Sequence, residues 1–106
     1  MVMKQYDVYY VELNPTKGSE MKKTRPAVII SPNVLNKHLN TVIIAPLTHS
    51  QKGYPSRIIT SINNQPGEIA LDQMRAVDKT RLKRKLGSLD KITSDNIKKV
   101  LQTMFS

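Results

Sequence analysis

Residues 41–47 read TVIIAPL, a run in which β-branched and other apolar side chains follow one another almost without interruption. Val, Ile and Thr favour extended backbone because their branched side chains pack well on a pleated surface. A strand that is apolar at successive positions has no face for water, so we expect it to be buried on both sides. Residues 27–30 (AVII), which follow Pro26, have the same character. These two runs predict two strands that are buried on both faces.

Further strands are predicted from residues that favour extended backbone and from the turn signals between them. Residues 33–40 are expected to form a short helix or a turn, and residues 63–67 (NNQPG) a turn. The further strands are expected at residues 6–13, 57–62, 68–72 (with an extension to residue 77 left open) and 85–89.

One helix is predicted at the end of the chain, where apolar residues recur at helical spacing. Thr93 or Ser94 is the expected N-cap, with Asp95 in the first turn. The apolar stripe should pack on the sheet or on a partner, and it consists of Ile97, Val100, Leu101, Met104 and Phe105. Short strands with one covering helix indicate a single domain over residues 1–106. Its predicted fold is mainly β with helices, a partly open barrel of the SH3-like or OB kind.

The charge balance points to a polyanionic partner. The 17 Lys and Arg residues exceed the 8 Asp and Glu residues by 9, in a chain of 106 residues. Nucleic acid is the first candidate, while acidic membrane head groups or an acidic protein stay open. With no Cys and two His residues, we expect no disulfide, no metal site and no cofactor.

No apolar run approaches the length of about 20 residues that a membrane span needs. The start of the chain does not resemble a signal peptide either, because Lys4, Gln5 and Asp7 interrupt it. The expectation is a cytoplasmic protein without membrane contact.

Three polar segments give a more specific indication. They are residues 14–20 (NPTKGSE) followed by 23–28 (KTRPAV), residues 46–55 (PLTHSQKGYP), and residues 67–75 (GEIALDQMR). In this order and spacing they resemble the MazF/PemK family of toxins. The resemblance implies a homodimer of SH3-like barrels, of the fold shared with CcdB toxins, that is inhibited by a cognate antitoxin. It also implies cleavage of single-stranded RNA at short sequences without metal, leaving a 2′,3′-cyclic phosphate and a 5′-hydroxyl.

Candidate catalytic residues lie in the first two of these segments. Arg25 is the expected phosphate stabiliser, because a guanidinium is always charged and can grip a phosphate with two hydrogen bonds. Thr48 could donate its hydroxyl to a phosphate oxygen. Glu20 could act as a base or orient Arg25. The alternative, in which Glu20 is a solvated carboxylate of the loop without a function, has equal weight. The resemblance to the family favours catalytic roles for Arg25 and Thr48 over purely structural ones.

A wider set of polar residues is expected to contact RNA. Some relatives use an acid at the position of Asp72 together with an Arg two residues earlier, but Ala70 stands there in this chain. Asp72 is therefore interpreted as a reader of base edges, and Arg75 as its partner or as a phosphate contact. The full candidate set is Ser19, His49, Ser50, Gln51, Lys52, Tyr54, Asp72, Gln73 and Arg75. The basic run 79–85 could add attraction that is independent of sequence.

Two other functions remain open at this stage. A CcdB-like toxin would poison DNA gyrase through a C-terminal helix that ends in aromatic residues. Here the chain ends in Met104, Phe105 and Ser106 without Trp, which disfavours this reading. A barrel that binds nucleic acid without cutting it is the third reading.

Overall fold

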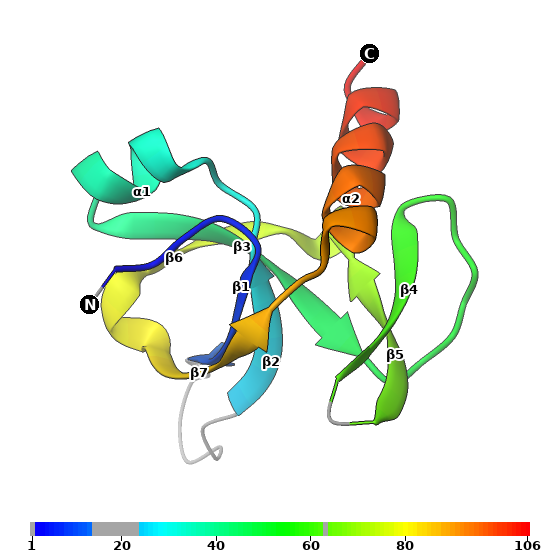
Figure 1. Cartoon of the computed structure of the whole chain (residues 1–106), viewed down its shortest axis with the longest axis horizontal. Coiled ribbons are helices and arrows are strands. Elements are labelled where there is room, and N and C mark those ends of the chain that lie inside the picture. Colours follow the sequence, from blue (N-terminus) through cyan, green and yellow to red (C-terminus); the bar gives the residue numbers. More distant parts are fainter. Residues whose placement is uncertain (1, 14–23, 63) are drawn as a thin grey trace, which may run out of the picture.

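The computed structural model describes residues 2–13, 24–62 and 64–106, and the strands within these ranges all pair in antiparallel fashion (Figure 1). In chain order the elements are β1 (Asp7–Glu12), β2 (Thr24–Ile29), α1 (Asn33–His38), β3 (Thr41–Thr48), β4 (Arg57–Ile62), β5 (Gln65–Ala70), the 3-10 turn η1 (Leu71–Gln73), β6 (Arg75–Asp78), the 3-10 turn η2 (Lys79–Arg81), β7 (Leu82–Ser88) and α2 (Lys91–Met104).

Strand β3 connects the whole sheet. It pairs with β2 on one edge, where Ala45 lies opposite Val28. On its other edge it pairs first with β6, from Thr41 to Ile44, and then with β5, at Leu47 and Thr48. The strand predicted for residues 41–47 is confirmed and has a central place in the sheet. The end of β3 is the point where β2 and β5 approach one strand from both sides.

The sheet curls into a partly open barrel, as the sequence predicts. Its strand order is β4-β5-β3-β2-β1-β7, with β6 attached to β3. Two apolar clusters lie on opposite faces of the strands, because neighbouring residues such as Val28 and Ile29 point in opposite directions. Val28 joins the cluster beneath α2, and Ile29 joins the cluster inside the curl. Both faces are buried at residues 27–29 of β2 and 44–47 of β3, which explains their successive apolar positions, whereas Thr41 and Ile43 are exposed.

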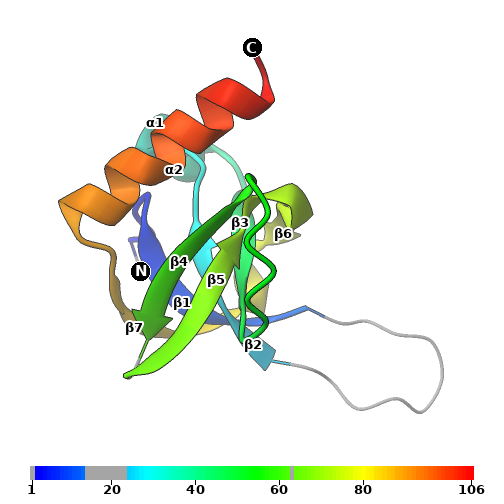
Figure 2. The ribbon, with the colours of Figure 1, turned by 90° about the vertical axis from the view of Figure 1, so that its right-hand side faces the viewer.

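Helix α2 covers the first cluster and runs obliquely above β4 and β5 (Figure 2). Ile97 is completely buried, and Val100, Leu101 and Met104 pack against the cluster, as predicted. Phe105 does not follow the stripe, because 71% of its surface is exposed.

The start of α2 was predicted too late. Asp90 is the N-cap, and its carboxylate accepts a hydrogen bond of 2.9 Å from the N–H of Thr93. Thr93 and Ser94 consequently lie inside the helix. Asp95 lies beyond the first turn, where it pairs with Lys91 at 3.1 Å. Of the helices in the described ranges, none is long and apolar enough to cross a bilayer.

Several other boundaries differ from the sequence-based expectation. Strand β2 begins at Thr24, so Arg25 lies within the strand rather than at its junction with the loop. Asp72 and Gln73 lie in η1 rather than at the end of a strand. The basic run 79–85 is divided between η2 and β7, and β7 itself extends over Leu82–Ser88. Strand β4 has the predicted bounds.

Candidate functional site

A cleft of about 320 Å³ opens at the end of β3. Tyr10 of β1 and Pro26 of β2 form one part of its lining, and Thr48 and His49 form another. The first residues of β5 and Leu47 complete it. The cleft thus lies where β3 passes from its pairing with β2 to its pairing with β5.

Thr48 is the last residue of β3 and is half-buried. Its Oγ1 atom lies 3.0 Å from the hydroxyl oxygen of Ser50 and donates to the main-chain oxygen of Ser50 at 3.3 Å. Across the strands, Thr48 faces Glu68 of β5. Its backbone is fixed by the sheet, while its hydroxyl remains beside the cleft.

Arg25 is exposed on β2 and lies opposite Val11, which is completely buried. The register of β2 and β3 pairs Ala27 with Pro46. Continued by two residues along each strand, the same register would bring Arg25 opposite Thr48. The two candidate catalytic residues are therefore carried by neighbouring strands.

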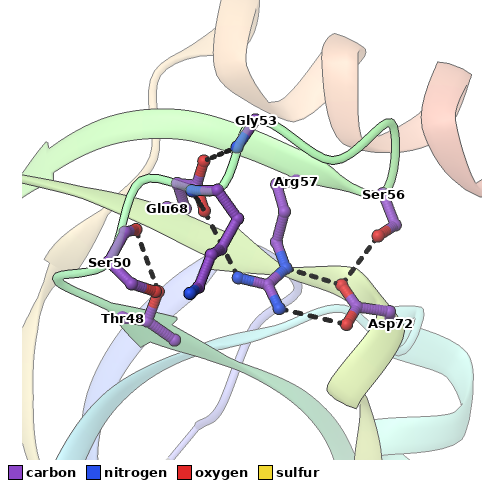
Figure 3. A network of polar contacts seen from close by, with 8 residues as sticks. Thr48, Ser50, Gly53, Ser56, Arg57, Glu68 and Asp72 are labelled. Carbon is purple, nitrogen blue, oxygen red and sulfur yellow. Dashed lines mark hydrogen bonds and ion pairs between the residues drawn. The ribbon is translucent and has the colours of Figure 1, made fainter.

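The loop between β3 and β4 is fastened to β5 by a single carboxylate (Figure 3). The side chain of Glu68 is 1% exposed and accepts the N–H of Lys52 at 3.1 Å and that of Gly53 at 2.9 Å. These hydrogen bonds, with that from Gly53 the strongest contribution, lower the pKa of Glu68 despite its burial. The carboxylate is thus held in its charged form, as an acceptor only.

Arg57 links this carboxylate to Asp72. Its Nη1 lies 3.3 Å from Glu68, while Nε and Nη2 donate to the two carboxylate oxygens of Asp72 at 2.7 and 3.2 Å. Ser56 donates to the same Asp72 at 2.7 Å. The hydrogen bond from Arg57 is the main cause that lowers the pKa of Asp72 to about 2, and it also raises the pKa of Arg57.

The third sequence segment is arranged differently from the expectation. Arg57, rather than Arg75, pairs with Asp72, so this carboxylate is already engaged on both oxygens. Arg75 donates instead to the main-chain oxygen of Leu13 at 3.3 Å. Gln73 is exposed in η1.

The remaining predicted RNA contacts lie mainly on the exposed loop after β3. His49, Ser50, Gln51, Lys52 and Tyr54 are all exposed there. The guanidinium of Arg57 stacks over the ring of Tyr54, 5.1 Å from its centre. Ser19 and Glu20 lie outside the described residues. Within the described ranges, no three side chains of His, Asp or Glu gather in a way that could hold a metal ion.

Tyr10, Arg84, Arg57 and Glu68 were not among the candidates predicted from sequence. The guanidinium of Arg84 lies 5.1 Å from the centre of the ring of Tyr10, which is one of the residues that line the cleft. Tyr10 and Arg84 are cross-strand neighbours of β1 and β7. The sequence offered one signal for Glu68. It is a charged residue in a predicted strand, between Gly67 and an apolar segment.

Comparison with known families adds a decisive observation. The family described as "PemK-like, MazF-like toxin of type II toxin-antitoxin system" matches residues 4–105. The chain belongs to this toxin family. The resemblance noted in the three polar segments is thereby confirmed.

Relatives in the PemK/MazF family are named as endoribonucleases. Endoribonuclease EndoA of Bacillus subtilis (strain 168) is 33% identical over 108 residues, covering 96% of this chain and 93% of that protein. Endoribonuclease toxin MazF of Escherichia coli (strain K12) is 35% identical over 71 residues, or 67% of this chain. In that comparison the chain spans 64% of the relative's length.

Solved structures of PemK/MazF proteins share the fold. A MazE-MazF structure from Deinococcus radiodurans superposes with a TM-score of 0.84 at 22% identity, covering 98% of this chain and 96% of that chain. An endoribonuclease in complex with its cognate antitoxin, from Mycobacterial species, gives a TM-score of 0.80 at 24% identity, covering 95% and 92%. The partly open barrel is therefore the fold of this toxin family.

Proposed function

We propose that the protein is a toxin endoribonuclease that cleaves single-stranded RNA, messenger RNA above all, at short sequences. The cleft at the end of β3 carries this proposal, because it brings Thr48 and His49 beside the strand that presents Arg25 to solvent. The relatives named as endoribonucleases support it. Such a substrate implies action in the cytoplasm, and the proposal covers residues 1–106 as one toxin domain.

Metal-independent cleavage of RNA is the reaction that suits these residues. The 2′-oxygen of the substrate attacks the adjacent phosphorus and loses its proton, while the bond from phosphorus to the 5′-oxygen breaks. The 5′-oxygen takes up a proton, so the products are a 2′,3′-cyclic phosphate and a 5′-hydroxyl. The protein has to stabilise charge on the phosphate oxygens and assist the two proton transfers.

Arg25 and Thr48 have complementary parts in this reaction. Arg25 would stabilise the negative charge on the phosphate with parallel hydrogen bonds from its guanidinium. Thr48 would donate its hydroxyl to a phosphate oxygen, giving up its bond with Ser50. Both are mounted on strands, which favours catalysis because a rigid support keeps a stabilising group in place. Glu20 stays a candidate base or orienting group.

The exposed residues of the loop after β3 would bind the RNA on either side of this point. His49, Ser50, Gln51 and Lys52 offer hydrogen bonds, and Tyr54 offers a ring for stacking. Tyr10 adds a second ring, in the lining of the cleft itself. Gln73 is exposed and suits base-edge contacts, while Ser19 and Arg75 stay candidates for phosphate or sugar contacts.

A homodimer and an antitoxin complete the proposal. The net charge of +9 suits an acidic antitoxin segment that would compete with RNA for the same surface. The solved relative in complex with its cognate antitoxin supports a partner of this kind. Light scattering of the purified toxin, alone and with the antitoxin, tests both assemblies.

The enzymatic proposal is tested with a panel of synthetic RNAs in the presence of EDTA. We expect cleavage, and a loss of about 100-fold or more in turnover for Arg25→Ala and for Thr48→Ala, the scale for one stabilising group. Lys98→Ala and Thr41→Ala are matched controls, because both side chains are exposed and lie away from the cleft. Both should keep wild-type rates.

Three outcomes would contradict parts of this proposal. Salt-dependent RNA binding without products would indicate a non-catalytic barrel. Inhibition of DNA gyrase in a supercoiling assay, without RNA cleavage, would indicate the CcdB-like activity. Full activity of both Ala variants would mean that Arg25 and Thr48 are not the catalytic residues.

A further inference from the structure

We propose that Glu68 is a positioning residue, which holds the loop of residues 49–56 in the shape that aims Thr48 at the scissile phosphate. This inference rests on the proposed function. It assigns a task to a buried carboxylate that takes no part in the chemistry itself.

The first argument is the burial of Glu68. A carboxylate is rarely placed in a strand where its side chain is 1% exposed, because removing a charge from water is costly unless partners replace the solvent. Here the partners are two consecutive N–H groups of the loop and the guanidinium of Arg57. The charge of Glu68 is thus used to bind a segment that lies outside the regular hydrogen bonding of the sheet.

The second argument is the conformation of that segment. Gly53 has a φ of +68°, a region that side chains disfavour and glycine adopts freely. Its N–H points to one carboxylate oxygen of Glu68, and the N–H of Lys52 points to the other. Two adjacent donors can converge on one carboxylate only while the backbone keeps this local shape. Glu68 and Gly53 therefore determine the loop conformation together.

The third argument is position. Glu68 is the direct cross-strand neighbour of Thr48, and their Cβ atoms are expected about 5 Å apart in such a pair. The loop leaves β3 directly after Thr48 and returns to the carboxylate opposite it. A change in the loop is therefore transmitted first to Thr48 and Ser50, whose hydroxyl groups are 3.0 Å apart.

Arg57 makes the arrangement compatible with RNA. Two carboxylates beside a phosphate would repel it, but the guanidinium lies between Glu68 and Asp72 and balances part of their charge. Arg57 also ties the start of β4 to η1 through Asp72, and Ser56 at the end of the loop donates to the same carboxylate. The three side chains connect two of the segments that are proposed to contact RNA.

The test compares single-turnover cleavage by wild type and Glu68→Gln at a temperature where circular dichroism shows both to be folded. A glutamine keeps the size but offers only one acceptor oxygen, so one of the two N–H groups loses its partner. We expect the cleavage rate to fall by about 10- to 100-fold, with a smaller change in RNA affinity, since displacement of a reacting group mainly slows the chemical step.

Asp7→Asn is the matched control. Asp7 is also a buried carboxylate that accepts a backbone N–H, that of Lys4, and pairs with a cation, Lys85 at 3.5 Å. It is outside the cleft lining. This variant should lose stability but cleave within about twofold of the wild-type rate. A lower free energy of unfolding does not by itself change the rate of the chemical step in protein that is still folded.

A double variant shows whether Glu68 acts through Thr48. In the Thr48→Ala background, Glu68→Gln should reduce the remaining rate by less than about threefold, because residues that act as a unit are not additive. Full additivity would overturn the positioning role.

Gly53→Ala provides a second route to the same loop if Glu68→Gln does not fold. Nothing lies within 4 Å of the added methyl group, so its effect comes from the backbone conformation alone. We expect a similar loss of cleavage rate. Wild-type rates in Gly53→Ala and Glu68→Gln would overturn the inference while leaving the proposed function intact. Absence of cleavage by the wild type itself would remove both.

Discussion

A methyl group on Gly67 would lie 2.6 Å from the main-chain carbonyl oxygen of Thr48. Real side-chain carbon atoms do not approach a carbonyl so closely, and the atom that would have to move belongs to the backbone of β3. Glycine at this position therefore allows β5 to approach β3 at the place where Thr48 borders the cleft.

Gly67→Ala should displace Thr48. The cleavage rate should therefore fall even under conditions in which the variant is still folded. We expect a cost of about 1–3 kcal/mol in the free energy of unfolding, as for other overpacked sites. Urea unfolding and cleavage at one temperature measure the two effects. A variant with wild-type activity would show that Thr48 tolerates movement of its backbone.

Tyr10→Ala should weaken RNA binding, while Tyr10→Phe should not. The ring of Tyr10 lines the cleft beneath the guanidinium of Arg84, and loss of a stacked base contact costs about 1–3 kcal/mol, or about 5- to 150-fold in affinity. The phenylalanine variant keeps the ring. Fluorescence anisotropy with a non-cleavable RNA checks this, and equal affinities of the two variants would contradict a stacking role.

Ile97→Ala should destabilise the fold by about 2–5 kcal/mol, the usual range for such a truncation in a core. The side chain of Ile97 is completely buried on the face of α2 that packs against the apolar cluster, whereas Ile92 of the same helix is 73% exposed. Ile92→Ala should therefore change the stability by less than about 0.5 kcal/mol. Urea unfolding distinguishes the two, and similar effects would contradict the observed orientation of α2.

Acid should destabilise the protein partly through Asp72. Its pKa is lowered from an ordinary value of 3.8 to about 2, so the folded state favours the charged form. That stabilisation is fully present above pH 4 and is lost as the pH falls towards 2. Between these values the melting temperature of wild type should fall more steeply than that of Asp72→Asn. Parallel curves for the two proteins would contradict this assignment.

RNA binding should weaken steeply with salt. If four phosphates are contacted, affinity should fall by about 50-fold between 50 and 200 mM salt, from the dependence known for single strands. Substitution of the exposed Lys83 by Ala should reduce this slope if the basic residues of β7 contribute. An affinity that does not depend on salt would contradict an electrostatic role for the excess of basic residues.

Strands β2 and β3 could be predicted from the sequence because burial on both faces requires apolar residues at successive positions. Strand β4 was predicted with its observed bounds, since a polar loop precedes it and a turn follows. The N-cap of α2 was missed because Ile92, in the first turn, is exposed and lies outside the apolar stripe. Without that apolar marker, the first turn could not be distinguished from the preceding loop.

The partners of Asp72 could not be predicted for a different reason. Arg57 lies 15 residues earlier in the chain, and only the pairing of β4 with β5 brings it alongside. Arg75, three residues away, was the nearer candidate in sequence but points to Leu13. Side-chain pairing across strands depends on register, which a single sequence does not specify at this precision.

The attachment of residues 49–56 to Glu68 has a consequence for protein engineering. A chimaera that receives this loop from another toxin without the residue that fastens it would have the sequence of the loop but not its conformation. Exchange of RNA preference between relatives should therefore require transplanting the loop together with the positions equivalent to Glu68, Arg57 and Asp72. If the loop contacts RNA as proposed, target choice would depend on a discontinuous set of residues from three places in the chain.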